Sequence, residues 1–116
     1  MADDVEEFQY ALRLRDDGNL DAARDLLITL SERRPDSAAL FAVLGDLQWN
    51  LDDLEGAITS FKTATQLAPK SEAASLGLFH CLWESDRLLD AIDECNRFLA
   101  IADAVEYRRI LTDLGH

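Results

Sequence analysis

Apolar residues recur at helical spacing in six stretches of this chain, grouped in pairs. The first stretches cover residues 5–15, 38–51 and 72–84, and the second stretches cover residues 20–33, 54–67 and 88–101. Apolar positions three and four residues apart predict amphipathic helices rather than strands. Pro35 and Pro69 end the first two pairs, and Ser37 and Ser71 are suited to cap the helices that follow. The pattern predicts an all-α fold made of helical hairpins.

The whole pattern repeats every 34 residues. Leu20, Leu54 and Leu88 superimpose at this offset, and an alanine follows three residues later in each copy. Turn-forming residues precede each set, at 18–19, 52–53 and 85–86. A helical hairpin of this size buries its apolar face only against a neighbour, so the period predicts a stacked array.

A seventh helix is expected after the third hairpin. Residues 104–114 place apolar side chains at helical spacing, and Asp103 with Glu106 forms a capping pattern at its start. Gly115 suits the end of this helix. Because the last hairpin of an array leaves an apolar face uncovered, we expect the seventh helix to cap it.

The second copy of the repeat carries a specific set of residues. Counted from Ala38, they are Phe41, Leu44, Gly45, Ala57, Phe61, Ala64 and Pro69. This set resembles the tetratricopeptide repeat family, and only Gln48 departs from that consensus, at a tyrosine position. The resemblance implies one domain over residues 1–116. It would contain repeats at 4–37, 38–71 and 72–103 and a capping helix at 104–114, wound into a right-handed superhelix, an α-solenoid.

The third copy departs from the family pattern at two buried positions. Phe79 and Phe98 stand where the family has small residues that let helices approach closely. Two extra rings do not fit such a contact without movement. We therefore expect the third hairpin either to splay or to draw on the segment that follows it.

In the family, the first helices of the hairpins line a concave groove. The resemblance implies that this groove is lined by Phe8, Leu12, Arg15, Ala42, Asp46, Trp49, Asn50, Leu76, His80, Trp83 and Glu84. Trp49 and Trp83 are 34 residues apart and hold the same place in successive repeats. They either form an exposed binding stripe or fill space between hairpins. Helix 38–51 has enough other apolar residues for its packing, which favours the stripe.

Family members that bind the acidic tails of heat-shock chaperones do so through a clamp of Lys, Asn and Arg side chains. The matching positions here hold Phe8, Leu12, Val43, Ala73 and Gly77. None of these side chains binds a carboxylate. The groove therefore suits another ligand, an amphipathic helix or extended segment with apolar anchors and basic flanks.

The composition narrows the choice of partner. The chain has 11 Lys and Arg against 23 Asp and Glu, a net charge of −12. This charge repels phosphate backbones and anionic lipids, so we expect neither nucleic acid nor membrane as partner. The absence of a long apolar run and the acidic start predict a cytoplasmic protein.

No set of residues in the sequence is typical of catalysis or metal binding. His80 and His116 are the only histidines, and Cys81 and Cys95 have no metal-binding spacing and are expected in the core. We therefore expect no enzyme activity, cofactor, metal or small-molecule substrate, and a protein as partner. Two functions stay open: a scaffold or adaptor, and a dedicated neutralising partner such as a secretion chaperone or an immunity protein for a basic toxin. A homo-oligomer is compatible with both.

Overall fold

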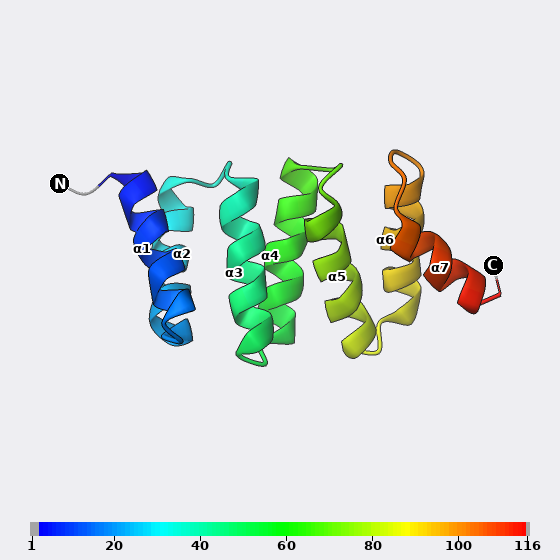
Figure 1. The fold of residues 1–116 in the computed structure, drawn as a ribbon, viewed down its shortest axis with the longest axis horizontal. Coiled ribbons are helices and arrows are strands. Elements are labelled where there is room, and N and C mark those ends of the chain that lie inside the picture. The colour runs from blue at the N-terminus through cyan, green and yellow to red at the C-terminus, as the bar shows by residue number, and fades with distance from the viewer. Residues whose placement is uncertain (1–2, 116) are drawn as a thin grey trace.

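The computed structural model describes residues 3–115, which form helices and no strands (Figure 1). The helices are α1 (Asp4–Asp16), α2 (Leu20–Arg33), α3 (Ala38–Asn50), α4 (Leu54–Leu67), α5 (Glu72–Glu84), α6 (Leu88–Leu99) and α7 (Val105–Asp113). Helices α1 to α6 form antiparallel hairpins in a row, and α7 is tilted against the C-terminal end of the row. The whole structure measures 53 × 26 × 20 Å. The predicted all-α solenoid is confirmed. His116 lies outside the described residues.

No helix within residues 3–115 is long and apolar enough to cross a membrane. The longest ones, α2 and α4, have 14 residues each and are amphipathic. A helix needs about 20 predominantly apolar residues to span a bilayer.

Side-chain caps begin two of the helices at the predicted residues. The hydroxyls of Ser37 and Ser71 each accept a hydrogen bond from the backbone amide three residues further on. The cap predicted for α7 is wrong. Ala104 holds the N-cap position of α7, and the Asp103 carboxylate is paired with the Arg108 guanidinium at 2.8 Å. A guanidinium within reach offers this carboxylate a charge-assisted hydrogen bond in place of the backbone amide.

One type of turn closes all three hairpins. Gly18, Asp52 and Asp86 have positive φ angles of 86°, 63° and 60°, and they lie 34 residues apart. In each turn the backbone amide of the residue after the positive-φ position donates a hydrogen bond to the carbonyl five residues before it. These bonds join Asn19 to Leu14, Asp53 to Gln48 and Arg87 to Leu82. This bond satisfies a carbonyl that the end of the helix would leave without a partner. The 34-residue period of the sequence is therefore also a period of the backbone.

Phe61 of α4 joins the second and third hairpins. Its ring is buried between Gly45 of α3 and Gly77 of α5. A Cβ atom added to Gly45 would come within 3.0 Å of the ring, and one added to Gly77 would come within 2.5 Å. Glycine at both positions thus lets the ring seat against the two backbones.

Tyr107 of α7 fills the space beside the two unusual phenylalanines of the third hairpin. Its side chain is fully buried, and its ring packs edge-on against Phe79 at 5.5 Å and against Phe98 at 5.8 Å between centroids. The third hairpin therefore draws on the segment that follows it, one of the two expected outcomes.

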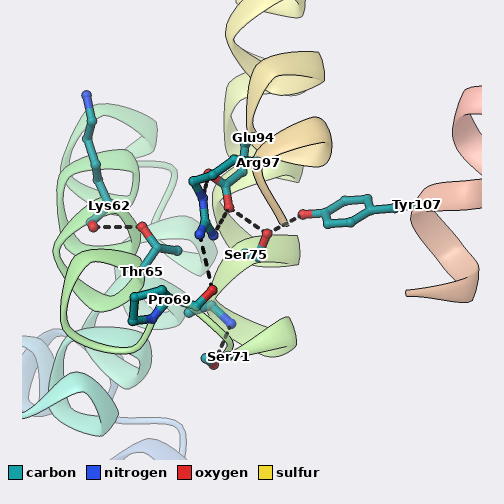
Figure 2. Close-up of polar contacts among 9 residues, drawn as sticks. Lys62, Thr65, Pro69, Ser71, Ser75, Glu94, Arg97 and Tyr107 are labelled. Atoms are coloured by element: carbon teal, nitrogen blue, oxygen red, sulfur yellow. Dashed lines mark hydrogen bonds and ion pairs between the residues drawn. The ribbon is translucent and has the colours of Figure 1, made fainter. Parts of the chain in front are cut away.

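Hydrogen bonds also hold α7 to the array (Figure 2). The Tyr107 hydroxyl lies 2.7 Å from Ser75 Oγ, which donates to the buried Glu94 carboxylate at 2.6 Å. Arg97 donates to the same carboxylate and to the backbone carbonyl of Pro69. Every charged or polar group of this network has a partner, as burial requires. The network connects the loop after α4 with α5, α6 and α7.

The seating of Phe61 predicts an unusual response to an alanine substitution. Gly77→Ala should destabilise the protein by about 1–3 kcal/mol through overpacking, although alanine is the better helix former by roughly 1 kcal/mol. Gly45→Ala, with its longer contact, should cost less. Urea unfolding measures both changes in stability. A Gly77→Ala protein as stable as the wild type, or more stable, would contradict this packing.

Burial of Tyr107 predicts a loss of stability at alkaline pH. Desolvation, with the negative charge of Glu94 nearby, raises the pKa of the Tyr107 hydroxyl above its ordinary value. Above pH ~10 the unfolded chain therefore releases a proton that the folded protein retains, so stability falls as pH rises. In Tyr107→Phe this decrease should be shallower, because phenylalanine does not ionise. Urea midpoints measured across this pH range test the difference, and equal slopes for the two proteins would exclude it.

Candidate functional site

The residues predicted to line the groove all lie on the first helices of the hairpins. They are Phe8, Leu12 and Arg15 on α1, Ala42, Asp46, Trp49 and Asn50 on α3, and Leu76, His80, Trp83 and Glu84 on α5. All of them are half-buried or exposed. Trp49 on α3 contacts His80 and Glu84 on α5. Phe8 instead packs on the core of the first hairpin and lines a separate pocket of about 140 Å³ with Leu30 and Leu40.

Trp49 bridges two successive hairpins. Its ring stacks on His80 of α5 at 6.1 Å with an angle of 14° between the planes, and its Nε1–H donates to Glu84 Oε2 at 2.9 Å. The side chain is half-buried and also packs against the core. Trp49 thus fills space between hairpins and still presents part of its indole to solvent.

Trp83 is more accessible than Trp49. It is 39% exposed, and its ring stacks on the buried Phe79 at 5.7 Å. His80 packs edge-on against the same Phe79 at 5.4 Å. Trp49, His80, Phe79 and Trp83 therefore form a continuous series, which we call the aromatic row. Since one member is buried in the core, the row is held in a fixed arrangement.

Acidic groups surround the aromatic row. Glu84 lies at its side, held by Trp49, and Glu106 Oε1 of α7 lies 3.6 Å from His80 Nε2. The Asp46 side chain is partly exposed, yet the surrounding helices desolvate its carboxyl and raise its pKa, while Arg15 opposes that shift. Arg15 itself is paired with Asp16 at 3.1 Å. These carboxylates make the surface beside the aromatic row acidic.

A pocket of about 330 Å³ lies between α5 and α7. It is lined by Phe79, His80, Trp83, Glu106, Ile110, Asp113 and Leu114, and we call it the α5–α7 pocket. The prediction from the sequence made α7 a cap alone and did not include its part in this surface. The spacing of Glu106, Ile110 and Asp113, at positions i, i+4 and i+7, places them on one face of the helix and could have indicated it.

The two cysteines are buried in the core. Cys81 and Cys95 are free and buried, as expected, and burial raises the pKa of the Cys81 thiol to about 12. A thiol that stays protonated is a poor nucleophile. Within residues 3–115, no group of three or more His, Cys, Asp or Glu residues could hold a metal ion.

The chain belongs to the tetratricopeptide repeat family. Two sequence profiles of this family match residues 8–72 and 50–114, which together run from within α1 to the end of α7. No curated protein matches the chain.

Solved structures of tetratricopeptide proteins share the fold. The first such domain of Spaghetti (RPAP3), bound to the HSP90 peptide SRMEEVD, is 15% identical with a TM-score of 0.81, covering 96% of this chain and 89% of that one. The type III secretion chaperone SycD of Yersinia enterocolitica, in complex with a peptide of the translocator YopD, is 17% identical with a TM-score of 0.78, covering 97% and 88%. A mutant of MamA is 22% identical with a TM-score of 0.75, covering 84% and 72%.

Proposed function

We propose that this protein is a protein-interaction module, a scaffold or adaptor without enzyme activity, that binds a peptide or helix in the groove of α1, α3 and α5. The observation that carries the proposal is the aromatic row, in which Trp83 and part of Trp49 remain accessible on the first helices. Fixed aromatic rings are common anchors at the centre of protein interfaces, because they bury much apolar area at a small entropic cost.

The charges beside the aromatic row select the ligand. Glu84 and Glu106 lie beside the rings, and the protein as a whole carries a charge of −12. An apolar segment with basic flanks matches this surface, with its apolar side chains on the rings and its cations beside the carboxylates.

The groove does not offer a site for an acidic tail. Of the positions that form the carboxylate clamp in related proteins, Phe8 and Leu12 are half-buried apolar side chains, and Gly77 lies under the ring of Phe61. The similarity to the Spaghetti domain in its HSP90 peptide complex therefore supports the fold, and we propose a ligand of different charge.

A second candidate is a dedicated neutralising partner that masks a basic protein, such as a secretion chaperone or an immunity protein for a basic toxin. The net charge of −12 favours it. Both candidates use the same surface. They differ in ligand, since an adaptor binds a short segment alone, whereas a neutralising partner requires the folded basic protein for full affinity.

Selection from a displayed library of random peptides tests the adaptor function, because it samples many ligand sequences at once. Wild-type protein serves as bait, and the Trp49→Ala/Trp83→Ala protein removes peptides that bind elsewhere. We expect the retained peptides to combine apolar anchors with Arg or Lys. A library that yields no peptide dependent on the two tryptophans would contradict binding of a short segment in the groove.

The double tryptophan substitution separates binding from folding. Trp49→Ala/Trp83→Ala should unfold cooperatively and lose well under the ~3–5 kcal/mol expected for each fully buried tryptophan. Its affinity for a selected peptide should fall on the order of a thousandfold, since aromatic anchors contribute about 2 kcal/mol or more each. Isothermal titration measures the affinity. Leu89→Ala is the control, because Leu89 on α6 is 82% exposed and lies outside the groove.

Fluorescence gives an independent measure of the same surface. Trp49 and Trp83 are the only tryptophans, so their emission should shift to the blue when a selected peptide covers them. If the tryptophan emission of the free protein is already that of a fully buried indole, and the double variant is unfolded, the rings serve packing alone.

A further inference from the structure

The α5–α7 pocket lies at the C-terminal end of the groove and combines three kinds of surface. Trp83 and His80 supply aromatic rings, Ile110 and Leu114 supply apolar walls, and Glu106 and Asp113 supply carboxylates. Its volume of about 330 Å³ is at the lower end of the range for small-ligand pockets, enough for one large side chain and too small for a helix.

The two carboxylates lie on one face of α7. Glu106 and Asp113 are seven residues apart, two helical turns, with Ile110 between them. Both line the same pocket as Trp83 on the facing helix α5. A group inside the pocket thus meets negative charge from α7 and an aromatic face from α5.

The charged groups near the pocket leave these carboxylates available to a ligand. Within residues 3–115, the ion-pair partner of Glu106 is His80, whose Nε2 lies 3.6 Å from Glu106 Oε1. The Glu106 side chain is 48% exposed. Arg108 of the same helix is paired with Asp103 outside the pocket. Glu84, the other acidic residue of α5 close by, is held by the indole of Trp49.

We propose that the α5–α7 pocket binds one arginine side chain of the partner and thereby sets where the partner's basic flank lies in the groove. This inference rests on the proposed function, because the arginine belongs to the segment bound along the aromatic row. The guanidinium plane lies on the Trp83 indole, its N–H groups donate to Glu106 and Asp113, and its methylene groups contact Ile110.

Arginine fits this pocket better than the other side chains that could enter it. Its guanidinium is planar, stacks on aromatic rings and is weakly hydrated, whereas the lysine ammonium is a compact and strongly hydrated charge. Two carboxylates around one pocket also suit a group with several N–H donors in a fixed plane. A leucine would contact the apolar walls but would desolvate Glu106 and Asp113 without a partner.

A binding experiment with matched peptides tests the arginine. A peptide retained by the wild-type protein and dependent on Trp49 is synthesised with each arginine replaced in turn by citrulline, which keeps the shape and removes the charge. At one position this replacement should reduce affinity about tenfold or more. The loss should nearly vanish in the Glu106→Gln/Asp113→Asn protein, because the carboxylates that recognise the charge are gone. Asp93→Asn, on α6 and outside the groove, is the matched control and should keep the full loss.

The outcomes distinguish this pocket from the groove as a whole. Two results would overturn the arginine pocket and leave the proposed function intact. Either the peptides depend on Trp49 but tolerate citrulline at every arginine, or citrulline reduces their affinity equally for the wild-type and the Glu106→Gln/Asp113→Asn protein. The same holds if lysine replaces the arginine with no loss of affinity. A library with no tryptophan-dependent peptide would overturn both. Melting curves of Glu106→Gln/Asp113→Asn confirm that the variant is folded, since both side chains are exposed.

Discussion

The seat of the Phe61 ring between two glycines is the contact on which the second and third hairpins depend. Gly45 and Gly77 belong to different hairpins, and each brings its backbone against the same ring. The approach of α3 and α5 at this point is what allows Trp49 to reach across to His80 and Glu84. Gly45 and Trp49 lie one turn apart on α3, and Gly77 and His80 lie one turn apart on α5, so the buried contact and the exposed rings share the same two helices.

The C-terminal end of the array depends on a second constraint. Phe79 and Phe98 occupy positions that are small in the family, and Tyr107 supplies the surface that these rings need. The hydroxyl of Tyr107 joins the buried network of Ser75 and Glu94, so α7 is fixed both by packing and by hydrogen bonds. Capping the core in this way also places Glu106 and Asp113 opposite Trp83, which turns a stabilising helix into a wall of the α5–α7 pocket.

The sequence was sufficient to predict the helices, because strong periodicity, a 34-residue repeat and two serine caps all indicate the same elements. It also placed the groove residues on the first helices, since helical spacing and the family pattern determine which face they share. The repeat boundaries and the role of these residues in binding stay predictions.

Contacts between helices could not be derived from the sequence in the same way. Trp49 was expected either in the groove or between hairpins. It packs between hairpins and stays half-buried, because its contact with His80 depends on how closely α3 and α5 approach. The cap at Asp103 was wrong because a local capping pattern says nothing about Arg108, which competes for the same carboxylate. The pocket beside α7 was missed for a similar reason, since it exists only where two elements meet.

The link between the buried ring of Phe61 and the exposed aromatic row is tested most directly by the proton NMR resonances of the His80 ring. Stacking on Trp49 should shift these resonances upfield in the wild-type protein, and Trp49→Leu should abolish the shift. Gly77→Ala, which disturbs only the buried contact, should reduce the same shift while Trp49 and His80 are both present. His80 resonances that are equal in the wild type and in Trp49→Leu, or that do not respond to Gly77→Ala, would contradict the dependence of the groove on this contact.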